Sequence, residues 1–110
     1  MFDAQAWYAR DVMMGKIQLP DAKGQKEHFD KWRTREGTLT SVEEMITYQG
    51  DYILGLTEAT DYPTIDTAGI KANFMEWAQN KAHDIITFRD FSHTSVITGN
   101  KATTHHTPWL

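Results

Sequence analysis

The chain contains no cysteine, so neither a disulfide nor a thiolate metal site can stabilise it. It has no apolar run long enough to span a membrane. The first residues, Met1–Ala4, carry neither the basic region nor the apolar stretch of a secretory signal. We therefore expect a soluble cytoplasmic protein that makes no contact with a membrane.

Positive charge is scarce: the net charge is −4 with neutral histidines, and the Lys and Arg residues are scattered along the chain. Proteins that bind nucleic acids concentrate basic residues on one face, so we expect no nucleic-acid partner. The 7 glycines are isolated from one another. None forms the G-x-G-x-x-G turn or the Walker loop that places a phosphate at a helix N-terminus. The chain also lacks a Ser-His-Asp spacing typical of nucleophilic catalysis.

Aromatic residues are plentiful at 12% of the chain, with 4 Trp, and can build a small core. Apolar spacing and capping residues predict four helices, at about residues 2–14, 21–35, 41–59 and 67–88. A Ser, Thr, Asn, Gly and His-rich tail follows at 89–110, where Ser95–Thr98 has strand propensity but no evident mate. The predicted fold is all-α, in a single helical domain over 1–110 with an extended tail and at most one short strand.

The first predicted helix carries an apolar stripe, and Trp7, Tyr8 and Val12 widen this apolar face. We therefore expect the helix to be buried on more than one side. The members of this stripe are Phe2, Ala6, Ala9 and Met13. The second helix has little apolar content, Phe29 and Trp32, and should lie at the surface with one narrow edge buried.

Helix starts are marked by capping residues: Asp21 for the second helix, a Ser41/Glu44 capping box for the third, and Asp66 or Thr67 for the fourth. The fourth helix should bury a stripe that Ile85 extends toward Phe88. Its members are Ile70, Phe74, Trp77 and Ala78.

An ordered set of short segments resembles the C-terminal part of bacterial flavin-containing monooxygenases of the trimethylamine monooxygenase type. The order and approximate spacing of these segments match from one end of the chain to the other. They are Phe2–Asp11, Tyr48–Tyr52, Thr60–Pro63, Phe88–Asp90, Ser95–Gly99 and His105–Trp109.

The resemblance implies ancestry and shape more than activity. Enzymes of that family bind FAD and NADPH through two Gly-rich turns, which this chain lacks, and they oxygenate soft nitrogen or sulfur through a flavin hydroperoxide. The family extends beyond both ends of this sequence, and the backbone ahead of Phe2 passes near the flavin. We expect no cofactor on the isolated chain. Apolar faces left uncovered should drive association into a homo-oligomer.

Candidate sites each have a structural alternative. His105 and His106 are weak metal candidates, because a metal needs three or four ligands and the only other histidine nearby in sequence is His93. A structural role for this part of the tail is favoured. Asp3 and Asp11, two helical turns apart, resemble an acid–base pair, but a helix-dipole role for Asp3 and an ion pair for Asp11 are favoured. Glu43 and Glu44 form a first-turn acidic pair. No catalytic, cofactor-binding or metal residue is assigned.

Aromatic and basic residues allow two further interpretations. Four aromatic residues could line an apolar pocket, although helical spacing favours a core role. They are Tyr48, Tyr52, Phe74 and Trp77. Four arginines could bind phosphate or carboxylate, although surface ion pairs are the favoured use. They are Arg10, Arg33, Arg35 and Arg89.

The sequence leaves two hypotheses for function. The first is a non-catalytic, self-associating helical module that acts by binding a protein or a small molecule. The alternative is one piece of a split FAD- and NADPH-dependent monooxygenase, which needs a separate flavin-domain chain to complete the active site.

Overall fold

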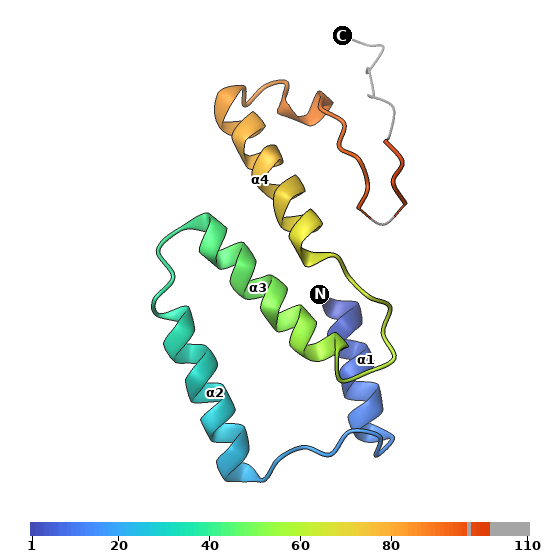
Figure 1. The fold of residues 1–110 in the computed structure, drawn as a ribbon. Coiled ribbons are helices and arrows are strands. Elements are labelled where there is room, and N and C mark those ends of the chain that lie inside the picture. Colours follow the sequence, from blue (N-terminus) through green and yellow to red (C-terminus); the bar gives the residue numbers. More distant parts are fainter. Residues whose placement is uncertain (97, 102–110) are drawn as a thin grey trace. The chain divides into compact units, whose positions relative to one another are not determined.

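A computed structural model describes residues 1–96 and 98–101. These residues contain the helices α1 (Phe2–Met13), α2 (Ala22–Glu36), α3 (Val42–Thr57) and α4 (Thr67–His83), and the short 3-10 helix η1 (Phe88–Asp90) (Figure 1). No strand occurs among them, so the all-α prediction is confirmed. Contacts divide the chain into two units, residues 1–64 and 65–110. The expectation of a single domain stays a prediction.

The predicted helix starts are confirmed by their caps. The side chains of Asp21 and Asp66 accept hydrogen bonds from the backbone N–H groups of Gly24 and Gly69, respectively. Ser41 and Glu44 form the predicted capping box, in which Ser41 Oγ accepts from Glu44 N at 3.1 Å and Glu44 Oε2 accepts from Ser41 N at 3.1 Å. These bonds satisfy N–H groups that a helix leaves free in its first turn.

In the first unit α1 packs against α3, and the amide of Gln5 donates to the Tyr52 hydroxyl at 2.9 Å. The buried residues of α1 are Ala4 and Asp11. The predicted buried stripe was wrong: Phe2 and Met13 are each 83% exposed, and Ala6 and Ala9 are also exposed. Periodicity located an apolar face, but α3 covers a neighbouring face of the same helix.

Helix α2 lies at the surface, as predicted, and buries no residue. Its edge contact with α3 is made by Trp32, whereas Phe29 is 58% exposed. The expectation that both residues form the buried edge was therefore half right.

In the second unit α4 ends at His83, earlier than the predicted Phe88. The carboxylate of Asp84 ends the helix by accepting hydrogen bonds from the backbone N–H of Ile86 and of Thr87 and from the Thr87 hydroxyl. These local bonds compete with helix continuation. Ile85 and Ile86 are consequently exposed instead of extending the apolar stripe.

The core of the second unit forms where η1 returns to α4. Phe88 is 3% exposed and meets the Trp77 ring edge-to-face, with ring centroids 5.6 Å apart. Phe74 contacts Trp77 from the same helix, while Ile70, at the start of the predicted stripe, is 42% exposed. The stripe is thus correct toward the C-terminal half of α4 only.

The segment after η1 folds along α4. Asn73 donates to the backbone carbonyl of Thr94 at 2.9 Å, and an isolated antiparallel bridge joins Thr94 to Lys101. A Cβ on Gly69 would lie 2.8 Å from Val96 Cγ1, so glycine permits this close approach. Within the described part of the chain, no helix is both long and apolar enough to cross a membrane.

Candidate interaction surfaces

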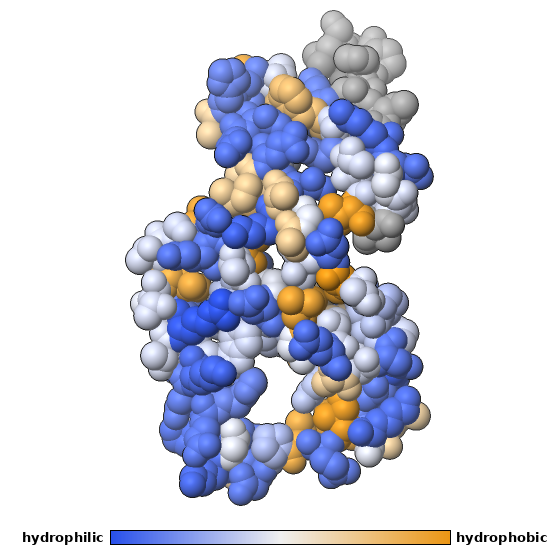
Figure 2. Space-filling model, in the orientation of Figure 1, coloured by the Kyte–Doolittle hydropathy of each residue, from blue (hydrophilic) through white to orange (hydrophobic). Residues whose placement is uncertain are grey.

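The first surface is the exposed apolar face of α1, which we call the α1 stripe: Phe2, Ala6, Ala9 and Met13. The adjoining Met14 is 64% exposed and extends it. Figure 2 shows apolar residues reaching the surface over this part of the first unit. Contiguous apolar surface of this kind marks a site of protein contact in many proteins.

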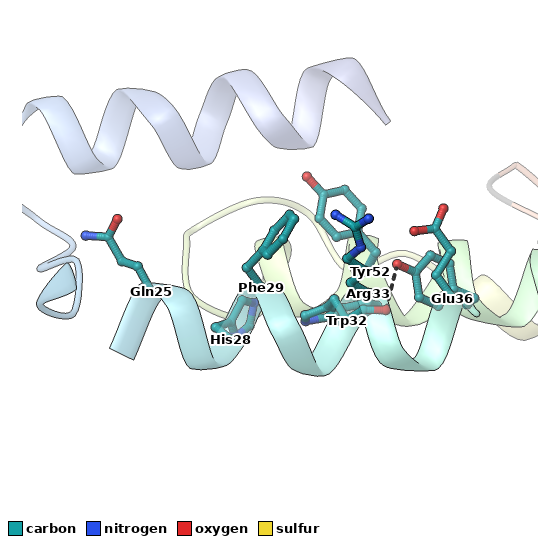
Figure 3. Close-up of a pocket in the computed structure, with 8 residues that line it drawn as sticks. Gln25, His28, Phe29, Trp32, Arg33, Glu36 and Tyr52 are labelled. Carbon is teal, nitrogen blue, oxygen red and sulfur yellow. Dashed lines mark hydrogen bonds between the residues drawn. The ribbon is translucent and has the colours of Figure 1, made fainter. Parts of the chain in front are cut away.

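The second surface is a cavity of about 460 Å³ between α2 and α3 (Figure 3). We call it the aromatic groove. It is lined by Gln25, His28, Phe29, Trp32, Arg33, Glu36, Tyr48 and Tyr52. A smaller cavity of about 260 Å³ shares His28, Trp32 and Tyr52 with it and reaches Tyr8 of α1. The two cavities therefore lie next to each other along α2.

A small aromatic cluster holds α2 at this groove. The Trp32 ring meets Tyr48 and Tyr52 edge-to-face at centroid distances of 5.1 and 5.8 Å, and the Tyr48 hydroxyl donates to the Trp32 carbonyl at 3.4 Å. Arg35 lies over the Trp32 and Tyr48 rings and pairs with Asp51 of α3. One side of α2 is thus anchored, and the side that bears Phe29 and Arg33 faces the open groove.

A polar cluster connects α1 to the turn after α3. Asp61 Oδ1 accepts from Trp7 Nε1 at 2.6 Å and from Arg10 Nη2 at 2.8 Å. These two hydrogen bonds, that of Trp7 first, lower the pKa of Asp61 from its usual 3.8 to about 2. The hydrogen bond to Asp61 is also the largest cause that raises the pKa of Arg10. The arrangement stabilises packing and contains no group poised for proton transfer.

The predicted carboxylate pairs have structural roles. Asp3 lies in the first turn of α1, whereas Asp11 is 3% exposed and pairs with Arg10 at 2.7 Å and with Lys16 at 3.5 Å. Asp3 and Asp11 therefore differ in both environment and partners. Glu44 serves the capping box, where hydrogen bonds from Thr40 lower its pKa.

The four predicted pocket aromatics divide between the two units. Tyr48 and Tyr52 line the aromatic groove, whereas Phe74 and Trp77 pack in the second unit. The arginines divide similarly. Arg10 and Arg35 form ion pairs, Arg89 lies over the Phe88 ring at 4.6 Å, and Arg33 lines the groove.

The histidine pair His105 and His106 lies outside the described residues. His93 Nδ1 lies 3.3 Å from Glu76 Oε2. Within residues 1–96 and 98–101, no group of three or more His, Cys, Asp or Glu side chains could hold a metal ion.

Sequence reasoning missed two features. One is the Trp7–Asp61 hydrogen bond, which joins residues 54 positions apart. The other is the row of Gln25, Phe29, Arg33 and Glu36 along the groove. The spacing of this row at three and four residues was the available signal, but its mixed polarity hid it from a search for apolar stripes.

Comparison with known proteins gives the ancestry of this arrangement. Trimethylamine monooxygenase of Methylocella silvestris is 46% identical over 110 residues, which is 100% of this chain and 24% of that protein. The enzyme of Roseovarius nubinhibens is 47% identical over 110 residues, covering 99% of this chain and 25% of the relative. The crystal structure of Tmm from Pelagibacter sp. strain HTCC7211 matches with a TM-score of 0.91 at 42% identity, over 98% of this chain and 24% of that chain.

The chain is homologous to the C-terminal part of trimethylamine monooxygenases. It spans about a quarter of the length of these relatives. No model of a known protein family matches it. The resemblance inferred from the short segments is confirmed, and Phe2, Ala6 and Ala9 of the α1 stripe belong to the first of those segments.

The starts of α2, α3 and α4 do not fit a dinucleotide phosphate. Asp21 and Asp66 place carboxylates on the N–H groups at the starts of α2 and α4, and Ser41 with Glu44 occupies those of α3. A phosphate would have to displace these groups and would meet negative charge at α2 and α4. The starts of these three helices are therefore unsuited to hold the phosphates of FAD or NADPH.

Proposed function

We propose that this chain serves as the helical part of a flavin-dependent monooxygenase of the trimethylamine monooxygenase type, and that it has no catalytic activity by itself. Its α1 stripe binds the nucleotide-binding part of such an enzyme. FAD and NADPH belong to that part, and the helical chain completes and stabilises the assembled fold.

The observation that carries the proposal is the exposed α1 stripe. In the relatives the matching segment is part of a chain about four times longer. Burying a Phe or Met side chain contributes roughly 1.5–3 kcal/mol. Phe2 and Met13, each 83% exposed, therefore leave a substantial driving force unused in this chain. Contact with the remainder of the enzyme's fold would use it.

The proposal can be tested by complementation. The Methylocella silvestris relative would be produced without the quarter that matches this chain, and mixed with the present protein. Binding is measured by light scattering after size-exclusion chromatography, and activity by trimethylamine-dependent NADPH oxidation. We expect a flavin-containing complex in which activity appears only in the mixture.

A matched pair of variants locates the contact. Met13→Glu places a charge in the α1 stripe and should weaken the complex on the order of tenfold or more, because a charge buried without a partner is strongly unfavourable. Met45→Glu, at a 50% exposed position on α3, should leave the complex intact. Absence of any complex with the wild-type chain would contradict the proposal.

A second candidate function is a stand-alone, self-associating module that binds a protein or small molecule. The open aromatic groove favours it, because a volume of about 460 Å³ with an aromatic lining is typical of binding sites. Size-exclusion chromatography with light scattering, with and without added FAD, separates the two candidates. A discrete oligomer that ignores both flavin and the truncated relative supports the second.

A further inference from the structure

We propose that Met13 and Met14 form an oxidation site, at which hydrogen peroxide converts both thioethers to sulfoxides and thereby prevents the α1 stripe from binding its partner. The site would make assembly depend on the oxidant to which the free chain is exposed. The inference rests on the proposed function, because it concerns the same contact with the nucleotide-binding part of a monooxygenase.

Sulfur chemistry in this chain belongs to methionine. The sequence has 5 Met and no cysteine. Peroxide reacts readily with cysteine thiolates, and their absence leaves the methionine thioethers as the sulfur atoms open to two-electron oxidation. Because peroxide must reach the sulfur atom, the exposure of each methionine side chain decides the order in which they react.

The five methionines differ in exposure. Met13 is 83% exposed and Met14 is 64% exposed, whereas Met1 and Met45 are each 50% exposed. Met75 of α4 is half-buried. Met13 and Met14 are also neighbours at the point where α1 ends and the connection to α2 begins (Figure 1). The two most accessible sulfur atoms therefore lie together, on the surface that we propose for partner binding.

Hydrogen peroxide balances the reaction without a further co-reactant. The thioether sulfur attacks one peroxide oxygen, an S–O bond forms and the O–O bond breaks. The other oxygen leaves as hydroxide and takes the proton of the new S–OH group, which gives the sulfoxide and water. The sulfur atom loses two electrons and the peroxide gains them. Methionine sulfoxide reductases reverse the change, so the modification can act as a switch.

The modification changes the surface of α1 and leaves its packing in place. The buried residues of this helix are Ala4 and Asp11, and neither exposed methionine belongs to the core. A sulfoxide is polar, so oxidation of Met13 places a polar group within the α1 stripe. That group would lose its water on binding, and a buried polar group without a partner is unfavourable.

Peptide mapping and complementation together test the inference on the full chain. The chain is treated with dilute hydrogen peroxide, the reaction is stopped with catalase, and mass spectrometry follows the gain of an oxygen atom at each methionine. We expect Met13 to react first, Met14 next and Met75 last. The oxidised chain should bind the truncated Methylocella silvestris relative more weakly, on the order of tenfold or more, and sulfoxide reductases should restore binding.

Leucine variants separate this site from the other methionines. The double variant Met13→Leu/Met14→Leu carries apolar side chains that peroxide does not oxidise. Its affinity for the relative, whatever the starting value, should be the same before and after treatment. Met45→Leu keeps the site and should lose affinity on oxidation as the wild type does. Far-UV circular dichroism of each oxidised chain should match that of the untreated chain.

Assembly should in turn protect the site. Met13 and Met14 should oxidise more slowly in the complex than in the free chain, because the partner covers their sulfur atoms. Met45, outside the proposed contact, should keep its rate.

Three results would overturn the inference and leave the proposed function intact. They are an oxidised chain that binds as tightly as the untreated one, a double leucine variant that loses affinity as the wild type does, and a loss of helical signal on oxidation. The second result would assign the effect to another methionine, and the third would mean damage to the fold. An untreated chain that forms no complex would instead contradict the proposed function, and this inference with it.

Discussion

The indole Nε1–H of Trp7 donates to Oδ1 of Asp61 over 2.6 Å, and this hydrogen bond joins the first helix to the turn that follows α3. Arg10 donates to the same oxygen at 2.8 Å. The carboxylate thus connects two segments that local sequence signals treat separately, and it gives the first unit a pH-dependent contact.

Asp61 should make stability depend on pH in an acidic window. Its pKa is lowered from 3.8 to about 2 in the folded protein, so its contribution is fully present above pH 3.8 and is lost as pH falls toward 2. Asp61→Asn should therefore be less stable than wild type near neutral pH, with the difference shrinking across this window. Urea unfolding at several pH values measures it.

Glu58→Gln, at an exposed position at the end of α3, provides the control for Asp61. It should keep the acid dependence of the wild type. An unchanged acid dependence in Asp61→Asn would show that the Trp7–Asp61 contact does not contribute to folding stability.

Phe88 should be the most sensitive aromatic position of the second unit. It is 3% exposed and packs on Trp77, so Phe88→Ala should lower the free energy of unfolding by about 3–5 kcal/mol through the cavity it leaves. Phe91→Ala, at 53% exposed, should lose much less. Thermal unfolding followed by near-UV circular dichroism compares them, and equal losses would contradict this assignment of the core.

Two glycines should respond to the same substitution with opposite signs. Gly15 has φ +71°, a left-handed conformation, so Gly15→Ala should destabilise by about 1–2 kcal/mol. Gly55 lies within α3 with no atom close to an added Cβ, so Gly55→Ala should stabilise the helix by about 0.5–1 kcal/mol. Chemical denaturation measures both. Destabilisation by Gly55→Ala would indicate a partner helix that approaches α3 closely.

The capping box should contribute measurably to α3. Ser41→Ala removes the acceptor for Glu44 N and should lower the free energy of unfolding by about 1 kcal/mol. Gln49→Ala, at an exposed position on the same helix, should have a smaller effect. If Ser41→Ala changed neither the far-UV circular dichroism signal nor the free energy of unfolding, α3 would be held by its packing alone.

Local chemistry made much of this fold predictable from sequence. Asp21, Ser41 and Asp66 start their helices through hydrogen bonds to N–H groups only a few residues away, so short sequence windows contain the signal. Asp84 ends α4 by equally local bonds, yet the apolar residues Ile85 and Ile86 beyond it suggested continuation. The ordered segments likewise indicated the homology to trimethylamine monooxygenases, because related proteins keep such segments in the same order along the chain.

Tertiary structure alone decided which surfaces are covered. Hydrophobic spacing identified an apolar face on α1. In the folded unit α1 contacts α3 and buries Ala4 and Asp11, whereas Phe2 and Met13 stay exposed. The aromatic groove arises because Trp32 reaches Tyr48 and Tyr52 from another helix while Phe29, one turn away, stays 58% exposed. A sequence specifies local hydrogen bonds directly, whereas burial depends on how distant segments meet in space.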